Sequence, residues 1–292
     1  MQPLSWLIKQ LCSAAVISWC CIFSSFGQGA QTAAIIDKNA RPQAFLQEGI
    51  TVPNDESTPT FTADGKTLYL CNNLKICVSK WEKDKWTTPQ LVSFSGQFKD
   101  WDPFLSPDGK RIIFVSNRPV PGAPAGQKNN HLWYVDLQAD GTWSDARHVD
   151  EPVNVNGVVA YGPCLTRLGT VAFCSRNRDG NKGMGGYWAK WIGGHYEKPQ
   201  QLKLNGDSDI YDPFISPNER YLIFASGGDL YISYRKGDGW SRGEKLGPQV
   251  NDGSQSGSPY VSPDGKILYY SNYKTNAIMM IPIHLPAQLI KT

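Results

Sequence analysis

The sequence predicts an all-β protein built as a single β-propeller of four-stranded blades. Three observations support this fold class: a motif that recurs along most of the chain, a tight-turn signature at its centre, and strand-type hydrophobic runs around that turn. We count five blades, with six as the alternative if the N-terminal segment folds differently.

The repeat is defined by prolines at corresponding positions, which are separated by 44, 60, 50 and 46 residues. A period of about 45 residues is typical of one four-stranded propeller blade. The five copies read TPTFTADGKTLYLCN from Thr58, DPFLSPDGKRIIFVSN from Asp102, GPCLTRLGTVAFCSR from Gly162, DPFISPNERYLIFAS from Asp212, and SPYVSPDGKILYYSN from Ser258.

Each copy is interpreted as a strand, a tight turn and a second strand. In residues 106–109 and 262–265, Pro holds the second turn position with its fixed φ, and Gly holds the fourth. The following run, as in residues 111–116, is nearly continuous β-branched and aromatic, as expected for a strand buried on both faces. Residues 167–169 and 218–219 depart from the Pro-Asp-Gly pattern, so we expect those two turns to be less regular.

An outer aromatic residue precedes the fourth strand in four copies, at Trp86, Trp143, Tyr196 and Trp240. A position that repeats serves the repeat first, so we expect these rings to pack blade against blade, with a sugar-stacking platform as the alternative. The fifth copy lacks this aromatic. Its missing outer strand is expected from residues 44–46, which would close the ring and remove exposed sheet edges.

The N-terminus predicts export. Residues 1–30 contain one basic residue, an apolar run and small residues suited to cleavage, so they resemble a secretory signal peptide, with a retained anchor as the alternative. Residues 31–43 are then a linker and residues 44–292 the propeller. After signal removal no stretch could span a bilayer, and we expect a periplasmic or secreted protein.

Composition supports a folded chain without a nucleic-acid partner. The 292 residues are 40% hydrophobic, which is too apolar for a disordered chain. A net charge of +3 from 29 basic and 26 acidic residues gives no overall footprint for nucleic acid or a membrane surface.

Four cysteines remain once the signal is removed. Cys71 with Cys77, and Cys164 with Cys174, fall on the two arms of predicted hairpins, which makes these pairs candidate disulfides in an oxidising compartment. The alternative is two pairs of small buried thiols. Spacings of six and ten residues are not those of a zinc site.

These motifs carry a family resemblance. With its SPDGK turns, DPF and SNR flanks and GMGG segment, the sequence resembles the WD-repeat-like propeller repeats of the C-terminal domain of TolB, and in particular stand-alone exported bacterial proteins built from them. The resemblance covers about residues 44–283. It implies the fold, and its motifs are structural ones.

Propeller connectivity places the candidate site. The connections into the inner strands and the loops between second and third strands should meet at one mouth of the central channel, with the SPDG turns at the other. Long loops on a rigid scaffold are where function tends to reside. The candidate ligand-binding residues at this mouth are Asp100, Trp101, Asp102, Tyr161, Arg176, Asp209, Tyr211 and Asp212.

Each candidate also has a structural interpretation. Asp102 and Asp212 precede proline and could cap the turn into the inner strand. The three aromatics share one offset before proline, so they could serve repeat packing or a stacking ring. Arg118, Arg176 and Arg178 are most simply solvated loop charges, with pairing to an anionic ligand as the alternative.

Catalytic and metal chemistry is sparse. His131, His148, His195 and His284 fall on or beside the third and fourth strands, away from the mouth, so neither a histidine metal centre nor a triad is predicted. We expect no cofactor, although carboxylates at the mouth could hold Ca²⁺.

The sequence therefore predicts an exported, non-catalytic propeller that binds an envelope protein segment or a glycan at its mouth. One alternative is a carbohydrate-active hydrolase that uses Asp102 and Asp212, since glycosidases need two nearby carboxyl groups. Another is a structural module of a cell-envelope assembly.

Overall fold

The computed structural model describes residues 35–45, 59–120, 122, 130–206 and 209–290. The chain divides into two compact units, residues 1–32 and 33–292, and the first lies outside the described residues together with the predicted signal peptide. Among the described residues, no helix is both long enough and apolar enough to cross a membrane.

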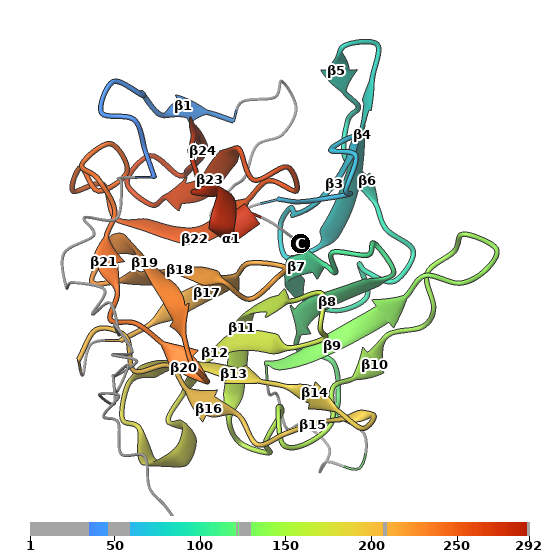
Figure 1. Ribbon diagram of the computed structural model, residues 1–292. Coiled ribbons are helices and arrows are strands. Elements are labelled where there is room, and N and C mark those ends of the chain that lie inside the picture. The colour runs from blue at the N-terminus through green and yellow to red at the C-terminus, as the bar shows by residue number, and fades with distance from the viewer. Residues whose placement is uncertain (1–34, 46–58, 121, 123–129, 207–208, 291–292) are drawn as a thin grey trace, which may run out of the picture. The chain divides into compact units, whose positions relative to one another are not determined.

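The described residues form five antiparallel sheets arranged in a ring, which is a five-bladed β-propeller (Figure 1). The prediction of five blades is confirmed. From inner to outer strand, blade 1 is β2 (Thr60–Phe61), β3 (Thr67–Cys71), β4 (Ile76–Glu82) and β6 (Gln90–Leu91); blade 2 is β7 (Asp100–Leu105), β8 (Arg111–Ser116), β9 (His131–Asp136) and β10 (Arg147–His148); blade 3 is β11 (Val159–Leu165), β12 (Val171–Arg176), β13 (Met184–Ala189) and β16 (Gln200–Gln201); blade 4 is β17 (Tyr211–Ile215), β18 (Tyr221–Ser226), β19 (Asp229–Lys236) and β21 (Glu244–Lys245); blade 5 is β22 (Ser256–Val261), β23 (Ile267–Asn272), β24 (Ala277–Pro282) and β1 (Gln43–Ala44).

Three blades carry short hairpin extensions beyond the third strand. They involve β5 (Lys85–Trp86), the pair β14 (Trp191–Ile192) and β15 (His195–Tyr196), and β20 (Gly239–Trp240). A 3₁₀ turn spans Arg178–Gly180, and the C-terminal helix α1 spans Ala287–Ile290.

The N-terminal strand closes the ring. β1 pairs with β24 through Gln43 opposite Met280 and Ala44 opposite Met279, and the Phe45 amide donates to the Ile278 carbonyl at 2.7 Å. The expectation that this segment supplies the missing outer strand of blade 5 is confirmed. The last residue of the predicted strand, Leu46, lies outside the described residues.

Part of the predicted linker is packed rather than free. Ile35 and Ile36 are buried in the largest core cluster, and the Ile35 carbonyl accepts a hydrogen bond from the His284 amide at 2.7 Å. Apolar side chains in this segment make its burial favourable. The ordered structure therefore begins before the expected boundary at residue 44.

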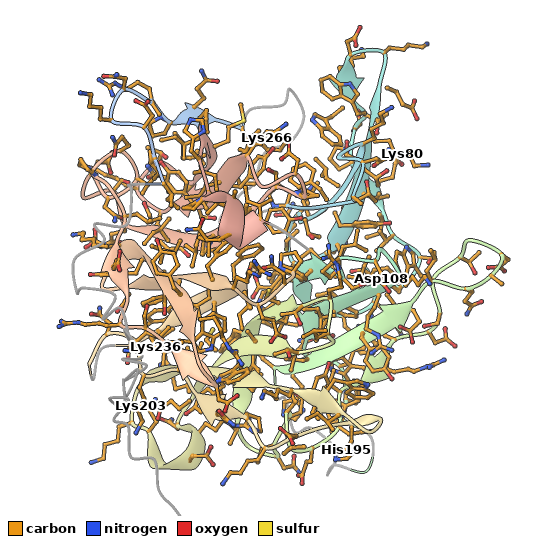
Figure 2. All side chains as sticks on the ribbon, in the orientation of Figure 1. Lys80, Asp108, His195, Lys203, Lys236 and Lys266 are labelled. Atoms are coloured by element: carbon orange, nitrogen blue, oxygen red, sulfur yellow. The ribbon has the colours of Figure 1, made fainter. Side chains whose placement is uncertain are left out.

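The core lies between the blades. One cluster joins blades 1 and 2 through residues such as Ile76 and Phe114, and a second joins blades 2 and 3 through Ile113 and Phe173. Figure 2 shows the side chains that fill these spaces, with exposed lysines such as Lys80 and Lys203 toward the outside. The second strands, such as β8, β12 and β18, are thus buried on both faces, as their hydrophobic sequences predict.

The outer aromatics pack against the neighbouring blade. Trp143 of blade 2 lies 6.0 Å from Tyr69 of blade 1, and Trp240 of blade 4 lies 6.2 Å from Trp188 of blade 3, measured between ring centroids. Both contacts are edge-to-face, a favourable arrangement for aromatic pairs. These two rings take the blade-packing role predicted from the repeat.

The expected irregularity of the turns in copies three and four is wrong. The Gly169 amide donates to Thr166 and the Glu219 amide donates to Ser216, as the Gly109 amide does to Ser106 in the SPDG turn of copy two. The departures instead create new contacts. Thr166 Oγ1 donates to Glu219 Oε1 at 2.8 Å, which joins the two turns to each other.

The departures in copy four also hold the C-terminus. Asn218 Nδ2 donates to the Leu289 carbonyl at 2.9 Å, and the Arg220 guanidinium donates to the Gln288 carbonyl. Helix α1 therefore docks at the end of the channel where these turns lie, near the centre of the ring in Figure 1.

Ring closure gives a stability prediction. The ring centroid of Phe45 lies 5.3 Å from that of Tyr269 and 6.1 Å from that of Phe61, so Phe45 links the closing strand to blades 5 and 1. We expect Phe45→Ala to lower the free energy of unfolding by about 3 kcal/mol in a denaturant titration. Leu168→Ala, at a residue that is 68% exposed, is the control and should change it by less than about 0.5 kcal/mol. Equal effects of the two substitutions would contradict closure by this contact.

Candidate functional site

A cavity of about 750 Å³ opens at one mouth of the channel. The predicted loops meet there, namely the connections into the inner strands and the loops between second and third strands. All five blades contribute to its lining, which consists of Leu74, Trp101, Asp102, Tyr161, Cys174, Arg176, Met184, Tyr211, Asp212, Ala225, Gly227, Gly228, Gln255, Ser256, Ser258 and Tyr273.

A repeated bulge shapes the floor of this cavity. In blades 2, 3, 4 and 5, the pairing between the inner and the second strand shifts register around the proline of the repeat. The residue before each proline has a positive φ, 49° at Asp102, 53° at Gly162, 47° at Asp212 and 45° at Ser258. A bulge bends the strand and re-aims its side chain, so these four residues line the channel.

The two aspartates of the bulges join neighbouring blades. Asp102 Oδ2 accepts a hydrogen bond from the Gly162 amide at 3.1 Å, and Asp212 Oδ2 accepts from the Ser258 amide at 3.3 Å and from Ser258 Oγ at 3.1 Å. Each carboxylate thus caps the bulge of the next blade, rather than the turn of its own. Asp102 and Asp212 therefore act as caps, as expected, but for the next blade and not for their own inner strand.

Both carboxylates lie against Gly162. A Cβ atom at residue 162 would sit 2.6 Å from Asp212 Oδ1, while the amide of the same residue binds Asp102. Burial raises the pKa of Asp212, and the hydrogen bonds from Ser258 oppose that shift. Asp102 and Asp212 come from non-adjacent blades, and this residue of blade 3 brings them together at the floor.

Aromatic rings form the walls. The centroids of Trp101 and Tyr161 are 6.3 Å apart, with 37° between the ring planes. Tyr161 accepts a hydrogen bond from Asn130 Nδ2 at 3.0 Å, and the Tyr211 hydroxyl donates to Asp209 Oδ2 at 3.1 Å. All three rings are half-buried and line the cavity, and these polar contacts hold the hydroxyls of the two tyrosines.

Arg176 is the cationic side chain among the described residues that line the cavity. Its side chain is exposed, and within the described part of the chain it makes no ion pair or hydrogen bond. It lies at the end of β12, close enough to Tyr211 to lower the pKa of that phenol, although burial gives a net increase.

A scan against protein-family models finds no match, and a search of curated protein sequences finds none. Solved structures do match. A TolB candidate from Agrobacterium tumefaciens has a TM-score of 0.52 at 20% identity, covering 74% of this chain and 68% of that one. A gluconolactonase from Xanthomonas campestris has a TM-score of 0.51 at 12% identity, covering 88% of this chain and 94% of that one.

The chain has a TolB-like β-propeller fold. At sequence identities of 20% and 12%, these similarities concern the fold alone.

Two of the predicted site residues do not line the cavity. Asp100 is completely buried, and accepts hydrogen bonds from Ser95 Oγ at 2.8 Å and Ser116 Oγ at 2.7 Å. Its ion pair with Arg118 measures 3.0 Å. The hypothesis that Asp100 contacts a ligand is therefore corrected, because its carboxylate is enclosed and satisfied within blade 2. Asp209 lies at the rim, where it holds Tyr211 and accepts from the Met184 amide at 3.1 Å.

The interpretation of Arg118 and Arg178 as solvated charges is wrong. Both are buried, and both guanidinium groups donate to carbonyls of the connection that precedes their own blade. Arg118 binds Phe94, and Arg178 binds Val153 at 2.7 Å. They fix the paths of the connections that frame the mouth.

Several cavity residues were not predicted. Met184, Gln255 and Tyr273 line the mouth from blades 3 and 5. Gln255 lies in the connection into the inner strand of blade 5 and Tyr273 in the loop after its second strand, which are the loop positions that predict the mouth in the other copies. Nothing in the sequence distinguishes Met184 from the core residues of β13.

The structure does not form the predicted disulfides, and the side chains of Cys71, Cys77, Cys164 and Cys174 are all buried. Cys71 pairs with Ile76, while Cys77 pairs with Leu70, the neighbour of Cys71. Consecutive residues of a strand point to opposite faces, so Cys71 and Cys77 cannot meet. Cys164 instead contacts the Ile215 carbonyl at 3.4 Å, and Cys174 contacts the Tyr161 carbonyl at 3.5 Å.

No cluster of three or more His, Cys, Asp or Glu side chains forms a metal site within the described residues. The Ca²⁺ site considered at the mouth would have Asp102 and Asp212 as its carboxylates, and within that part of the chain no third one joins them.

Two histidines, the buried His131 and the half-buried His148, form a pair on the outer part of blade 2. His131 Nδ1 and His148 Nε2 are 2.8 Å apart. Burial lowers the pKa of both, and the neighbouring His131 helps to lower that of His148 to about 4. The pair lies away from the mouth, as its strand positions predict.

Gly162 provides a test of the floor. Alanine at this position would force φ of +53° on a residue with a Cβ and would displace the Asp212 carboxylate. Gly109→Ala is the matched control, because its φ is +72° and nothing lies within 4 Å of the added Cβ. We expect Gly162→Ala to reduce the free energy of unfolding by about 2 kcal/mol more than the control. Equal losses in urea titrations would show that Asp212 does not depend on this contact.

The histidine pair predicts a pH dependence. An unfolded histidine titrates near 6.5 and the folded His148 near 4, so the unfolded chain binds more protons in this window. Stability contributed by the neutral pair is present above about pH 6.5 and is lost as the pH falls toward about 4. Thermal melts between pH 7 and pH 4 should show a smaller decrease in Tm for His148→Gln than for wild type. His195→Gln, on the exposed β14–β15 hairpin, should keep the wild-type slope.

Proposed function

We propose that this chain is an exported, non-catalytic propeller that binds a protein segment or a glycan at the mouth of its channel. The main support for this proposal is the cavity of about 750 Å³, which is lined by half-buried aromatic rings and by Arg176. Within the described residues, the Arg176 side chain forms no ion pair. Concave sites of this size, mostly apolar with a few polar groups, are typical of ligand binding. The predicted signal peptide supports placement in the periplasm or outside the cell.

The chemistry of the lining supports binding without catalysis. Oxygen atoms of Asp102 and Asp212 are occupied by backbone amides of the next blade. Burial raises the pKa of the Cys174 thiol well above its usual value, which opposes formation of a thiolate nucleophile. The described lining also contains no histidine that could act as a general base.

A hydrolase is the second candidate, and one observation favours it. Asp102 and Asp212 both lie against Gly162, and the raised pKa of Asp212 suits a general acid. The Xanthomonas propeller, a gluconolactonase, shows that this fold can carry an enzyme. Turnover of a glycoside or lactone that is abolished by both Asp102→Asn and Asp212→Asn would establish this alternative.

A purely structural envelope module is the third reading. It would gain support if the mouth proved to be filled by the protein's own loops.

Binding at the mouth predicts a specific mutational pattern. A partner from an envelope extract or a glycan array should bind wild type, and Trp101→Ala or Tyr211→Ala should weaken its Kd by about tenfold each, since a buried aromatic contact contributes about 1 to 2 kcal/mol. Trp191→Ala, at an exposed ring of the β14–β15 hairpin, is the matched control and should leave the Kd unchanged. Unchanged affinity in both mouth variants, for every partner identified, would exclude this function.

A further inference from the structure

The cavity has carboxylates at its floor and its cation at the rim. Asp102, Asp212 and Ser258 line both the cavity and a smaller pocket of about 50 Å³ deeper in the channel. The two aspartates therefore lie where the cavity meets this smaller pocket, whose volume suits water better than a ligand. A group that enters the mouth and reaches this depth meets carboxylate oxygens.

The floor lacks a compensating positive charge at Asp212. Its hydrogen-bond partners are the amide and hydroxyl of Ser258 and the Cys174 thiol, all of them neutral groups. Within the described residues Arg176 forms no ion pair with it. Burial raises the pKa of Asp212 because it destabilises the ionised carboxylate. A cation that enters the cavity would stabilise this ionised form.

The walls above this floor suit the same charge. Trp101 and Tyr161 stand side by side on blades 2 and 3, and Tyr211 comes from blade 4. A cation within about 6 Å of an aromatic face is attracted by the ring, most strongly by tryptophan. The small residues Ala225, Gly227 and Gly228 of blade 4 also line the cavity.

Resting on the proposed function, we infer that the ligand is a protein segment anchored by a lysine or arginine side chain. That side chain enters between Trp101, Tyr161 and Tyr211, and its charged end binds the carboxylates of Asp212 and Asp102. The flanking chain then lies across the rim, where Arg176 can donate to its carbonyl or carboxylate oxygens. A neutral glycan would satisfy the aromatic walls but would bring no charge to the floor.

The test uses small probes on the purified protein. Nα-acetyl-arginine amide and Nα-acetyl-lysine amide carry the cation, Nα-acetyl-citrulline amide is the neutral near-isostere of the first, and Nα-acetyl-glutamate amide carries the opposite charge. We expect ligand-observed NMR to show millimolar binding of both cationic probes, at least tenfold weaker binding of the citrulline probe, and none of the glutamate probe. Binding of the cationic probes should weaken with added salt.

Variants locate the effect. Asp212→Asn keeps an oxygen that can accept from Ser258 and removes the charge, so it should weaken the arginine probe about tenfold. Asp264→Asn, in the turn at the opposite end of the channel, is the control and should bind as wild type. If Asp212→Asn does not fold, the comparison of arginine and citrulline probes on wild type still decides the question.

The outcomes separate this inference from the function on which it rests. Equal binding of the arginine and citrulline probes, or an unchanged affinity in folded Asp212→Asn, overturns the cationic anchor. If at the same time a glycan binds in a manner that depends on Trp101, the mouth is still the binding site and its ligand is a glycan. If neither the probes nor any partner depends on Trp101, the proposed function fails as well.

Discussion

The hydrogen bond between an inner-strand carboxylate and the bulge of the next blade is the interaction on which this propeller's channel depends. Asp102 binds the Gly162 amide and Asp212 binds Ser258, so neighbouring blades are joined at their innermost residues. Hydrogen bonds to a charged acceptor are stronger than neutral ones, and these lie in a partly enclosed place. They fix the width of the channel where its mouth cavity ends.

The same bulge connects fold to function. Positive φ at the residue before proline is unfavourable for residues other than glycine, and it is retained in three blades with Asp or Ser at that position. The strained conformation turns these polar side chains toward the channel. It also leaves the preceding aromatic, Trp101, Tyr161 or Tyr211, on the cavity wall. A single local distortion, repeated by blade, thus supplies both the floor and the walls.

The sequence predicts the architecture well because the repeat encodes it several times. Proline spacing gives the number of blades, and the position of the fourth strands shows that residues 44–46 must complete blade 5. The bulge was not predictable, since the segment DPF has the composition of a regular strand and a residue before proline normally favours extended backbone. Pairing of Cys71 with Cys77 failed for a related reason, because sequence separation alone does not tell which face of a strand a side chain occupies.

Charged residues were the least predictable part of the candidate site. Asp100, Arg118 and Arg178 resemble solvated loop residues in sequence, yet each is buried, and the two guanidinium groups donate to carbonyls of the connections between blades. Such contacts depend on how neighbouring blades meet, which local patterns do not specify. Arg176 differs from Arg178 by two positions, and that separation is enough to place one in the cavity and the other in the core.

The central claim is that the protein binds through this one mouth of its channel. Hydrogen exchange of the protein with and without a captured partner tests it most directly, because it reports on every blade at once. The account predicts slower exchange at the entries to the inner strands, in residues 159–162, 209–213 and 255–258. Protection confined to the opposite turns, in residues 106–110, 216–221 and 262–266, or to the outer strands, would contradict it.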